Sequence, residues 1–305
     1  MPDIDSNSQS DEWSRWLLHV RHAGDPLFND KIRVSLERYA DRVLDGAALE
    51  PGMTLADIGS GEGLVAFRAI GRIGPSLRVL LTDISTPLLR HAEDLANKQG
   101  VRQQCTFVEC SADNLSALAD SSVDVVTTRA VLAYVADKGR ALREFLRVLK
   151  PGGRISLAEP IFQDDAFVAC ALRTLVEARR ADSADRFQPL LHKWKAAQFP
   201  DTHQKIAASP LANFSERTLF ELIRVAGFAQ IHLELHVDLC PSEITSWEVF
   251  LGSSPHPWAP PLDDILPQQF TPEERQHFEQ VMRPLVESGN ATTTMRNVYV
   301  TAIKT

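Results

Sequence analysis

Short apolar runs alternate with amphipathic segments from about residue 50 of the chain onward. Five of the runs have the length and the glycine or polar boundaries that are typical of buried parallel strands. They cover residues 53–58, 78–82, 105–110, 123–128 and 154–158. Three intervening segments place apolar side chains at helical spacing. These cover residues 64–73, 86–99 and 138–149. The alternation predicts an α/β fold, a Rossmann-like doubly wound parallel sheet with right-handed crossovers.

The alternation of strands and helices stops after Pro160, where two helix-like stretches (165–181 and 186–198) follow one another. Residues 231–239 and 296–304 then alternate as strands, and a proline-rich stretch separates them. We expect four parts. The first, residues 1–50, is a disordered leader (to Asp11) followed by a helical cap, and the second, residues 51–160, is the cofactor-binding core. The third, residues 161–213, is a helical insertion. The fourth, residues 214–305, completes a seven-stranded sheet and contains a second helical insertion at 241–290.

Net charge, apolar segments and cysteine spacing limit the kinds of partner and the cellular location that we expect. The formal net charge is −8, whereas a bulk nucleic-acid binder needs a basic surface, so we expect no nucleic-acid partner. No segment is apolar and long enough to span a bilayer, and the polar N-terminus has no secretion signal, which predicts a cytoplasmic protein with no membrane partner. The four cysteines lack paired metal-ligand spacing and are interpreted as reduced, mostly buried thiols, with thiol redox chemistry as the alternative. No metal site is expected.

The strongest local signal is the loop Asp57-Ile58-Gly59-Ser60-Gly61-Glu62-Gly63, between a predicted strand and a predicted helix. Glycines at alternate positions let the backbone turn tightly and approach a bulky ligand. Asp83 stands twenty residues after Gly63, at the end of the next strand, where a carboxylate can accept hydrogen bonds from both hydroxyls of an adenosine ribose. A nicotinamide dinucleotide is the competing ligand, but it favours a third glycine one residue later and a phosphate-neutralising residue.

With this loop, Asp83, "VDVVTTR" at 123–129 and "LREFLRVLKPGGRISLAEP" at 141–160, the chain resembles the class I S-adenosylmethionine-dependent methyltransferases. The resemblance is close over about residues 50–160 and implies an antiparallel last strand. It also implies S-adenosylmethionine as cofactor, with Gly59 and Gly61 against its methionyl part. The cofactor-binding residues that we expect are Asp57, Gly59, Gly61, Gly63, Asp83, Ile84 and Ala112 with Ser111 beside the adenine, and Arg129.

Arg129 stands at the carboxyl end of the fourth strand, the edge at which ligands of such sheets bind. Its guanidinium suits a bidentate grip on a carboxylate, and an ion pair with Glu159 or Asp57 is the alternative. Arg21 and His22 form a second polar cluster ahead of the core. Trp16, with Trp13, and Trp247 are candidate walls of the acceptor pocket, and helix packing is the alternative for each. The candidate catalytic residues are Arg129, His22 and Glu159, and the candidate substrate residues are Arg21, Trp16 and Trp247.

These residues favour an enzyme that methylates a carboxylate-bearing small molecule. S-methylation of a thioether such as methionine needs no base, and "RHAGD" at 21–25 with Arg129 is similar to the bacterial methionine S-methyltransferases. The main rival is an O- or N-methyltransferase of a secondary metabolite, with His22 or Glu159 as base. A non-catalytic binding subunit with the same fold is the third hypothesis. The helical caps would enclose a small substrate and could also form a homodimer interface.

Overall fold

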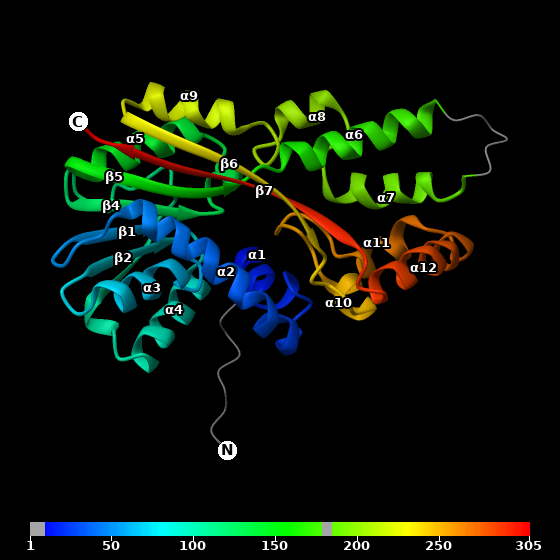
Figure 1. The fold of residues 1–305 in the computed structure, drawn as a ribbon, viewed down its shortest axis with the longest axis horizontal. Coiled ribbons are helices and arrows are strands. Elements are labelled where there is room, and N and C mark those ends of the chain that lie inside the picture. The colour runs from blue at the N-terminus through cyan, green and yellow to red at the C-terminus, as the bar shows by residue number, and fades with distance from the viewer. Residues whose placement is uncertain (1–9, 179–184) are drawn as a thin grey trace, which may run out of the picture.

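The computed structural model describes residues 10–178 and 185–305. The predicted leader lies outside the described residues up to position 9, and so does the end of the helix expected at 165–181. Within the described residues, the core is a seven-stranded sheet in the order β3-β2-β1-β4-β5-β7-β6 (Figure 1). The strands are β1 Thr54–Ile58, β2 Arg78–Asp83, β3 Cys105–Glu109, β4 Val123–Arg129, β5 Leu149–Pro160, β6 Ala229–Pro241 and β7 Thr292–Ile303.

The pairing of the strands confirms the predicted fold. Strands β1 to β5 pair in parallel, whereas β7 runs antiparallel to both β5 and β6. The carboxyl ends of the parallel strands β1, β2 and β4 therefore lie at the same edge of the sheet, which is the edge where ligands bind. The order reverses between β1 and β4, which is the point where such sheets bind ligands.

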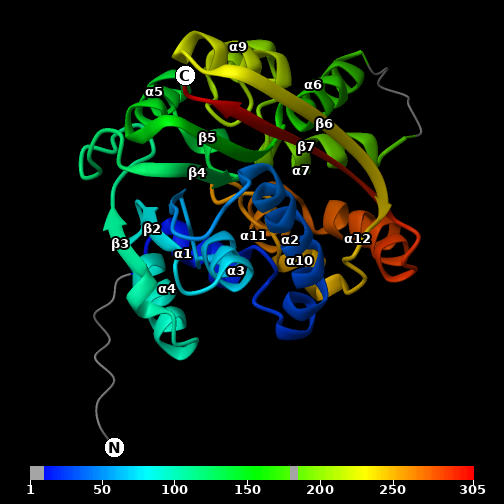
Figure 2. The ribbon, with the colours of Figure 1, turned by 60° about the vertical axis from the view of Figure 1, so that its left-hand side comes forward.

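Helices cover both faces of the sheet (Figure 2). The C-terminal half of α2 (Pro26–Ala47) packs with α3 (Leu64–Ile73) and α4 (Thr86–Lys98) in one apolar cluster. On the other face, α5 (Lys138–Val148) and α9 (Glu216–Ala226) form a second cluster. Successive side chains of a strand point to opposite faces of the sheet and so enter different clusters. Leu55 of β1 belongs to the first cluster and Ala56 to the second.

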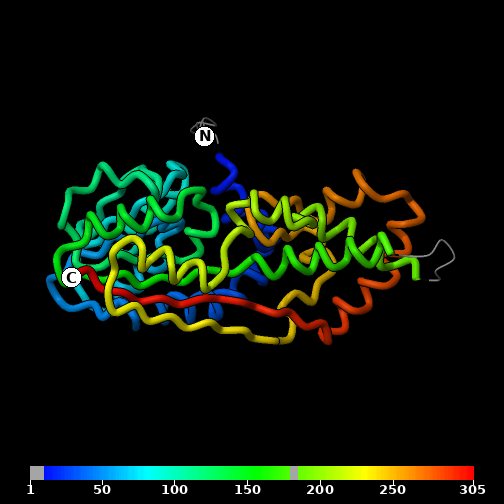
Figure 3. The backbone as a smooth tube through the Cα atoms, turned by 90° about the horizontal axis from the view of Figure 1, so that it is seen from above, coloured from blue at the N-terminus to red at the C-terminus, as the bar shows by residue number. Residues whose placement is uncertain are grey.

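Two helical additions form a second lobe beside the sheet, and long β6 and β7 reach into it (Figures 1 and 3). The first addition holds α6 Gln163–Glu177, α7 Gln188–Gln198 and α8 His203–Ala208, and the second holds α10 Trp247–Gly252, α11 Leu262–Gln269 and α12 Pro272–Glu287. Helix α12 begins at the predicted capping box of Thr271 and Glu274. Helix α9 is capped by Ser215 and ends at Gly227, as predicted.

The N-terminal segment is helical, as expected, but it is broken into pieces. Helix α1 (Glu12–Arg15) continues as a π-helix from Trp16 to Val20 and ends in a turn before Asp25 caps α2. The break occurs at Ala23 and Gly24, which both adopt a positive φ. Because of this turn, α1 and the π-helix lie over the ligand edge of the sheet while α2 packs along its face. None of the described helices has the length and apolar character needed to cross a membrane.

Close packing of α2 on the sheet gives a stability prediction. A Cβ atom at Gly46 would lie 2.7 Å from Ser156 Oγ and 2.7 Å from Thr301 Cγ2, and Ser156 Oγ donates a hydrogen bond to the Val43 carbonyl. We expect Gly46→Ala to lower the free energy of unfolding in urea by about 1–3 kcal/mol, because overpacking outweighs the gain in helix propensity. Gly71→Ala in α3 is the matched control. Nothing lies within 4 Å of its added methyl, so it should stabilise by up to about 1 kcal/mol. Equal stability of the two variants would contradict the packing.

Candidate active site

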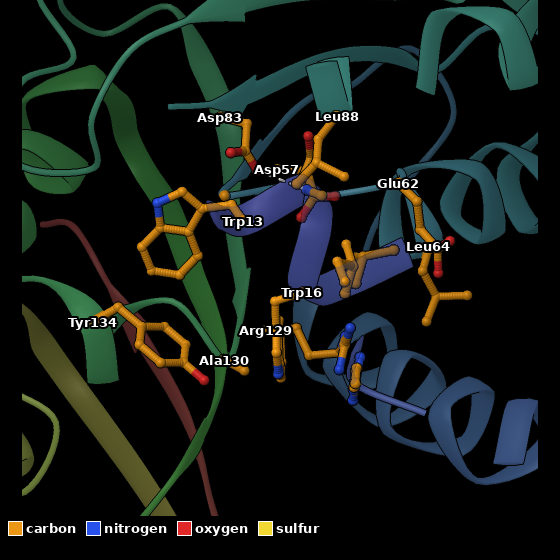
Figure 4. A pocket seen from close by; sticks show the side chains of 16 residues that line it. Trp13, Trp16, Asp57, Glu62, Leu64, Asp83, Leu88, Arg129, Ala130 and Tyr134 are labelled. Atoms are coloured by element: carbon orange, nitrogen blue, oxygen red, sulfur yellow. Dashed lines mark hydrogen bonds between the residues drawn. The ribbon is translucent and has the colours of Figure 1, made fainter. Parts of the chain in front are cut away.

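A pocket with about 720 Å³ of empty space, its mouth included, opens at the carboxyl edge of β1, β2 and β4 (Figure 4). The glycine loop after β1, Asp83 of β2 and Arg129 of β4 supply its floor. The N-terminal segment crosses above them. Its residues in the pocket wall are Trp13, Trp16, Leu17 and Arg21. The sheet edge and the N-terminal helices thus meet around one site.

The glycine loop brings the main chain close to its neighbours. Gly59 has a φ of +63°, and a Cβ atom there would lie 2.5 Å from Val131 Cγ2. Gly61 has a φ of +55°, and its Cβ would lie 3.1 Å from Leu17 Cδ2 of the π-helix. Both positions therefore favour glycine for backbone conformation, and Gly59 also requires it for space. The Gly61 amide donates to Asp83 Oδ2 at 2.9 Å, which fixes the loop against the next strand.

Asp83 has the properties needed to hold a ribose. Its carboxylate is buried yet lines the pocket, and Oδ1 accepts a hydrogen bond from the Ser85 amide at 2.9 Å. Burial raises the pKa of Asp83, and the backbone donors oppose that effect. Each carboxylate oxygen has a second lone pair, so two acceptors stay available for hydroxyl groups in the pocket.

Asp57 offers a second fit to the cofactor. Thr127 Oγ1 donates to Asp57 Oδ1 at 2.9 Å, whereas the buried Oδ2 has no hydrogen-bond partner among the described residues. Burial raises the pKa of Asp57 to about 7. An unsatisfied carboxylate oxygen at the pocket floor suits a cationic group. S-adenosylmethionine carries an ammonium and a sulfonium, so the residues present fit this cofactor, which Gly59, Gly61, Asp57 and Asp83 would hold.

Arg21 and Arg129 both line this pocket although they come from distant parts of the chain. Desolvation lowers the pKa of both guanidiniums, and desolvation together with repulsion from Arg129 lowers the pKa of Arg21 to about 10. Glu62 attracts both, and Asp57 and Glu159 also attract Arg129, yet no carboxylate of the described residues lies within 4 Å of either guanidinium. Arg129 therefore makes no direct ion pair with Glu159 or Asp57, which act on it only through longer-range attraction.

Aromatic side chains form one wall, and sequence reasoning missed part of it. The ring of Tyr134 lies edge-to-face with Trp13 at 5.2 Å and with Trp258 at 5.5 Å between centroids. Burial raises the pKa of Tyr134, so its hydroxyl stays protonated and can donate a hydrogen bond. No motif marks Tyr134; its place, five residues after Arg129 at the ligand edge, is the only signal.

Trp16 joins this pocket to a neighbouring one. Its indole donates a hydrogen bond to the Ser254 carbonyl at 3.2 Å, and Arg21 lies 5.3 Å from its ring. Trp16 also lines the second pocket, of about 550 Å³, together with Trp258 of the second helical insertion. The expected placement of Trp16 and Arg21 beside a ligand pocket therefore agrees with the geometry.

Glu159 does not lie where a catalytic base is needed. Its carboxylate is fully buried and accepts hydrogen bonds from Thr128 Oγ1 at 2.7 Å and from the Val131 amide at 2.9 Å. Burial raises its pKa, and it does not line the pocket. Its expected catalytic role is corrected: it anchors the turn after β4, which positions Arg129 and Tyr134.

His22 and Trp247 also lie outside the pocket lining. His22 Nδ1 is 2.7 Å from Asn29 Oδ1, its ring packs on Phe28, and burial lowers its pKa to about 4. An imidazole with these contacts is a neutral packing residue rather than a base poised near neutral pH. Trp247 is buried in the apolar cluster of the second lobe, stacked on Phe250. Both expectations are corrected by tertiary packing.

The remaining expected residues border the site. Gly63 caps α3 and its φ is +84°. Ile84 follows Asp83 and is half exposed. Ser111 and Ala112 come shortly after β3. The preceding residue, Cys110, donates its backbone amide to the Asp83 carbonyl at 3.0 Å. They lie at the same sheet edge but beyond the pocket lining. Their contact with adenine stays a prediction.

A family model described as a methyltransferase domain matches residues 49–204. The ubiquinone/menaquinone biosynthesis C-methyltransferase of Idiomarina loihiensis is 27% identical over 67% of this chain and 78% of its own length. The enzyme of that name from Ectopseudomonas mendocina is 29% identical over 73% and 84%.

Solved structures agree on the fold. The YcgJ protein from Bacillus matches with a TM-score of 0.55 at 17% identity, over 88% of this chain and 98% of its own. A candidate sarcosine dimethylglycine methyltransferase from Galdieria sulphuraria matches with a TM-score of 0.54 at 15% identity, over 97% and 99%. From the matched domain, the glycine loop and the pocket together, the chain belongs to the methyltransferase-domain family and is a class I S-adenosylmethionine-dependent methyltransferase.

Proposed function

We propose that this enzyme methylates a small molecule that carries a carboxylate, with Arg21 and Arg129 as its anchors. The observation that carries the proposal is the pair of half-buried guanidiniums in one pocket, with no carboxylate of the described residues within 4 Å of either. Enclosing two like charges is costly unless an anion neutralises them. The cofactor brings one carboxylate of its own, which leaves one guanidinium for an anionic acceptor. Bidentate recognition is the geometry that arginine offers to a carboxylate.

The protein's part in the reaction is positioning and shielding. When bound, S-adenosylmethionine would supply a sulfonium methyl group, whose carbon bonds to the acceptor in line as S-adenosylhomocysteine leaves. Alignment of two bound reactants can supply roughly 7–11 kcal/mol of such a barrier. Trp13, Trp16 and Leu17 cover the ligand edge and keep water from it. The Tyr134 hydroxyl, protonated at neutral pH, can donate a hydrogen bond to an acceptor oxygen.

The acidic and basic groups of the pocket favour an acceptor atom that needs no deprotonation. No histidine lines the pocket in residues 10–178 and 185–305. Asp57 and Asp83 have contacts that suit the cofactor, and Glu159 and His22 lie elsewhere. Glu62 also lines the pocket, where its carboxylate attracts the two arginines. A thioether such as that of methionine keeps a free lone pair at neutral pH, and methionine also carries the carboxylate. This weakens the alternative of a phenol or amine acceptor with His22 or Glu159 as base.

A second candidate is methylation of an aromatic ring carbon. The relatives from Idiomarina loihiensis and Ectopseudomonas mendocina are named ubiquinone/menaquinone biosynthesis C-methyltransferases. The aromatic wall of Trp13, Tyr134 and Trp258 would pack against a planar ring. This candidate does not account for the two arginines unless the ring also carries an acidic group.

Methyl-labelled S-adenosylmethionine separates these candidates. The enzyme is incubated with thioether amino acids, carboxylic acids, amines, phenols and hydroquinones, and mass spectrometry locates the label. We expect label on a carboxylate-bearing acceptor, and a pH profile of kcat/KM without a pKa of acceptor deprotonation. Label confined to neutral hydroquinones would refute the carboxylate proposal. Cofactor binding in calorimetry with no labelled product from any acceptor would favour the non-catalytic subunit.

A further inference from the structure

Strand β6 forms one edge of the sheet, and its outer side is open. It pairs with β7 over residues 229–241 and with no other strand in the described part of the chain. Figures 2 and 3 show β6 at the outer rim of the molecule. Half of its backbone N–H and C=O groups therefore point away from the sheet, which is a template for pairing with another strand.

One face of this edge is apolar beyond the helices that cover the sheet. Ile231 and Leu233 pack against the core cluster of α5 and α9. The next residues on the same face are Leu235, Val237 and Leu239, with 43%, 57% and 71% of their surface exposed. Exposure rises along the strand because β6 runs past the covering helices toward the second lobe. The result is an apolar row on an unpaired strand.

The polar residues between them are arranged almost symmetrically about Leu235. The segment reads Ile-His-Leu-Glu-Leu-His-Val-Asp-Leu over residues 231–239. If a second copy paired antiparallel across a two-fold axis at Leu235, Glu234 would face His236 of the other copy. His232 would then face Asp238, and every apolar residue would face an apolar residue. Each polar pair sets an imidazole against a carboxylate, and complementary polar pairs and apolar pairs across strands both stabilise a sheet.

Neighbouring registers lose this match. An axis at Glu234 would set that carboxylate against its own copy, and an axis at His236 would set Glu234 against Asp238. A shift by one residue would place apolar against polar side chains on each face. The charges are also held in position, since Glu234 pairs with Arg42 of α2 and with both histidines.

We propose that two copies of this chain form a homodimer by antiparallel pairing of β6 with β6, centred on Leu235. The two sheets become one continuous sheet of fourteen strands, in which Val237 and Leu239 of each copy face Leu233 and Ile231 of the other. The pocket at the ligand edge is separate from this interface. The proposal therefore does not rest on the identity of the acceptor.

The first test is the mass in solution. Sedimentation equilibrium of the full chain should give twice the chain mass of 33.9 kDa at micromolar concentration. His232→Asp sets two carboxylates opposite each other at both symmetry-related sites, and should weaken the dimer roughly tenfold or more. The double variant His232→Asp/Asp238→His exchanges the partners and should restore dimerisation.

Controls keep the outcome specific to the interface. Gln103→Asp places a charge on an exposed residue just before β3, at the opposite edge of the sheet, and should leave the dimer intact. Apart from changes that follow from loss of the dimer itself, the thermal unfolding temperature and the cofactor affinity of every variant should match those of the unsubstituted chain. A monomer across the concentration range overturns the proposal. A dimer that His232→Asp does not weaken, or that the exchange does not restore, overturns the pairing about Leu235.

Discussion

Replacing Gly59 by alanine should lower the affinity for S-adenosylmethionine by about thirty-fold to several-thousand-fold. The added Cβ would meet Val131 at 2.5 Å, and the φ of +63° is unfavourable for any side chain. Left-handed backbone costs alanine about 1–2 kcal/mol, and a forced contact adds about 1–3 kcal/mol. Val131 is stiff at χ1 and its amide is held by Glu159, so the strain should move the glycine loop instead. Titration calorimetry with S-adenosylmethionine measures the change.

Two further variants isolate the cause. Gly52 has a φ of +88° and nothing within 4 Å of an added Cβ, so Gly52→Ala pays only the backbone term and should bind the cofactor normally. Val131→Ala removes the atoms that the new methyl would strike. Adding it to Gly59→Ala should therefore recover part of the affinity. If Gly59→Ala bound as well as Gly52→Ala, the loop would not be the cofactor cradle that the family membership implies.

The elements of the fold follow from local signals in the sequence. The capping box at Thr271 and Glu274 and the stop at Gly227 mark helix ends because side-chain and glycine chemistry act within a few residues. The glycine loop and Asp83 were found in the same way, since the spacing of strand, turn and helix is fixed by the fold. Cofactor chemistry was therefore accessible from the sequence.

The acceptor side depends on contacts between distant segments. Tyr134 meets Trp13 across the chain, and neither residue type predicts that contact. Glu159 and His22 looked like bases by residue type and position. Their roles were decided by buried partners, the Val131 amide for Glu159 and the Asn29 side chain for His22. Trp247 was drawn into the apolar cluster of the second lobe, whose packing no local pattern reveals.

The sequence singled out Arg129 and Arg21 individually, and the tertiary structure brings them into one pocket. Replacing Arg129 tests the proposed role of this pair with two readouts. Arg129→Met removes an enclosed guanidinium that has no ion-pair partner among the described residues. We expect acceptor binding to weaken by about 2–4 kcal/mol, which is roughly thirty- to a thousand-fold, while the affinity for S-adenosylmethionine stays nearly unchanged. We also expect the ligand-free protein to become more stable toward urea, because the desolvation cost of the charge is removed. Competition binding of the identified acceptor and urea titration measure the two effects.

Those two readouts distinguish an acceptor anchor from a structural arginine. A structural arginine would destabilise the fold on removal, and an arginine that holds the cofactor carboxylate would lose cofactor affinity instead. Arg78→Met is the matched control, because Arg78 lies at the opposite end of β2, is exposed, and donates to the Gln103 carbonyl at 3.0 Å. It should leave both binding affinities unchanged. Arg129→Lys keeps the charge without the planar fork, so partial retention of acceptor binding would identify charge, and full loss would identify bidentate geometry, as the basis of recognition.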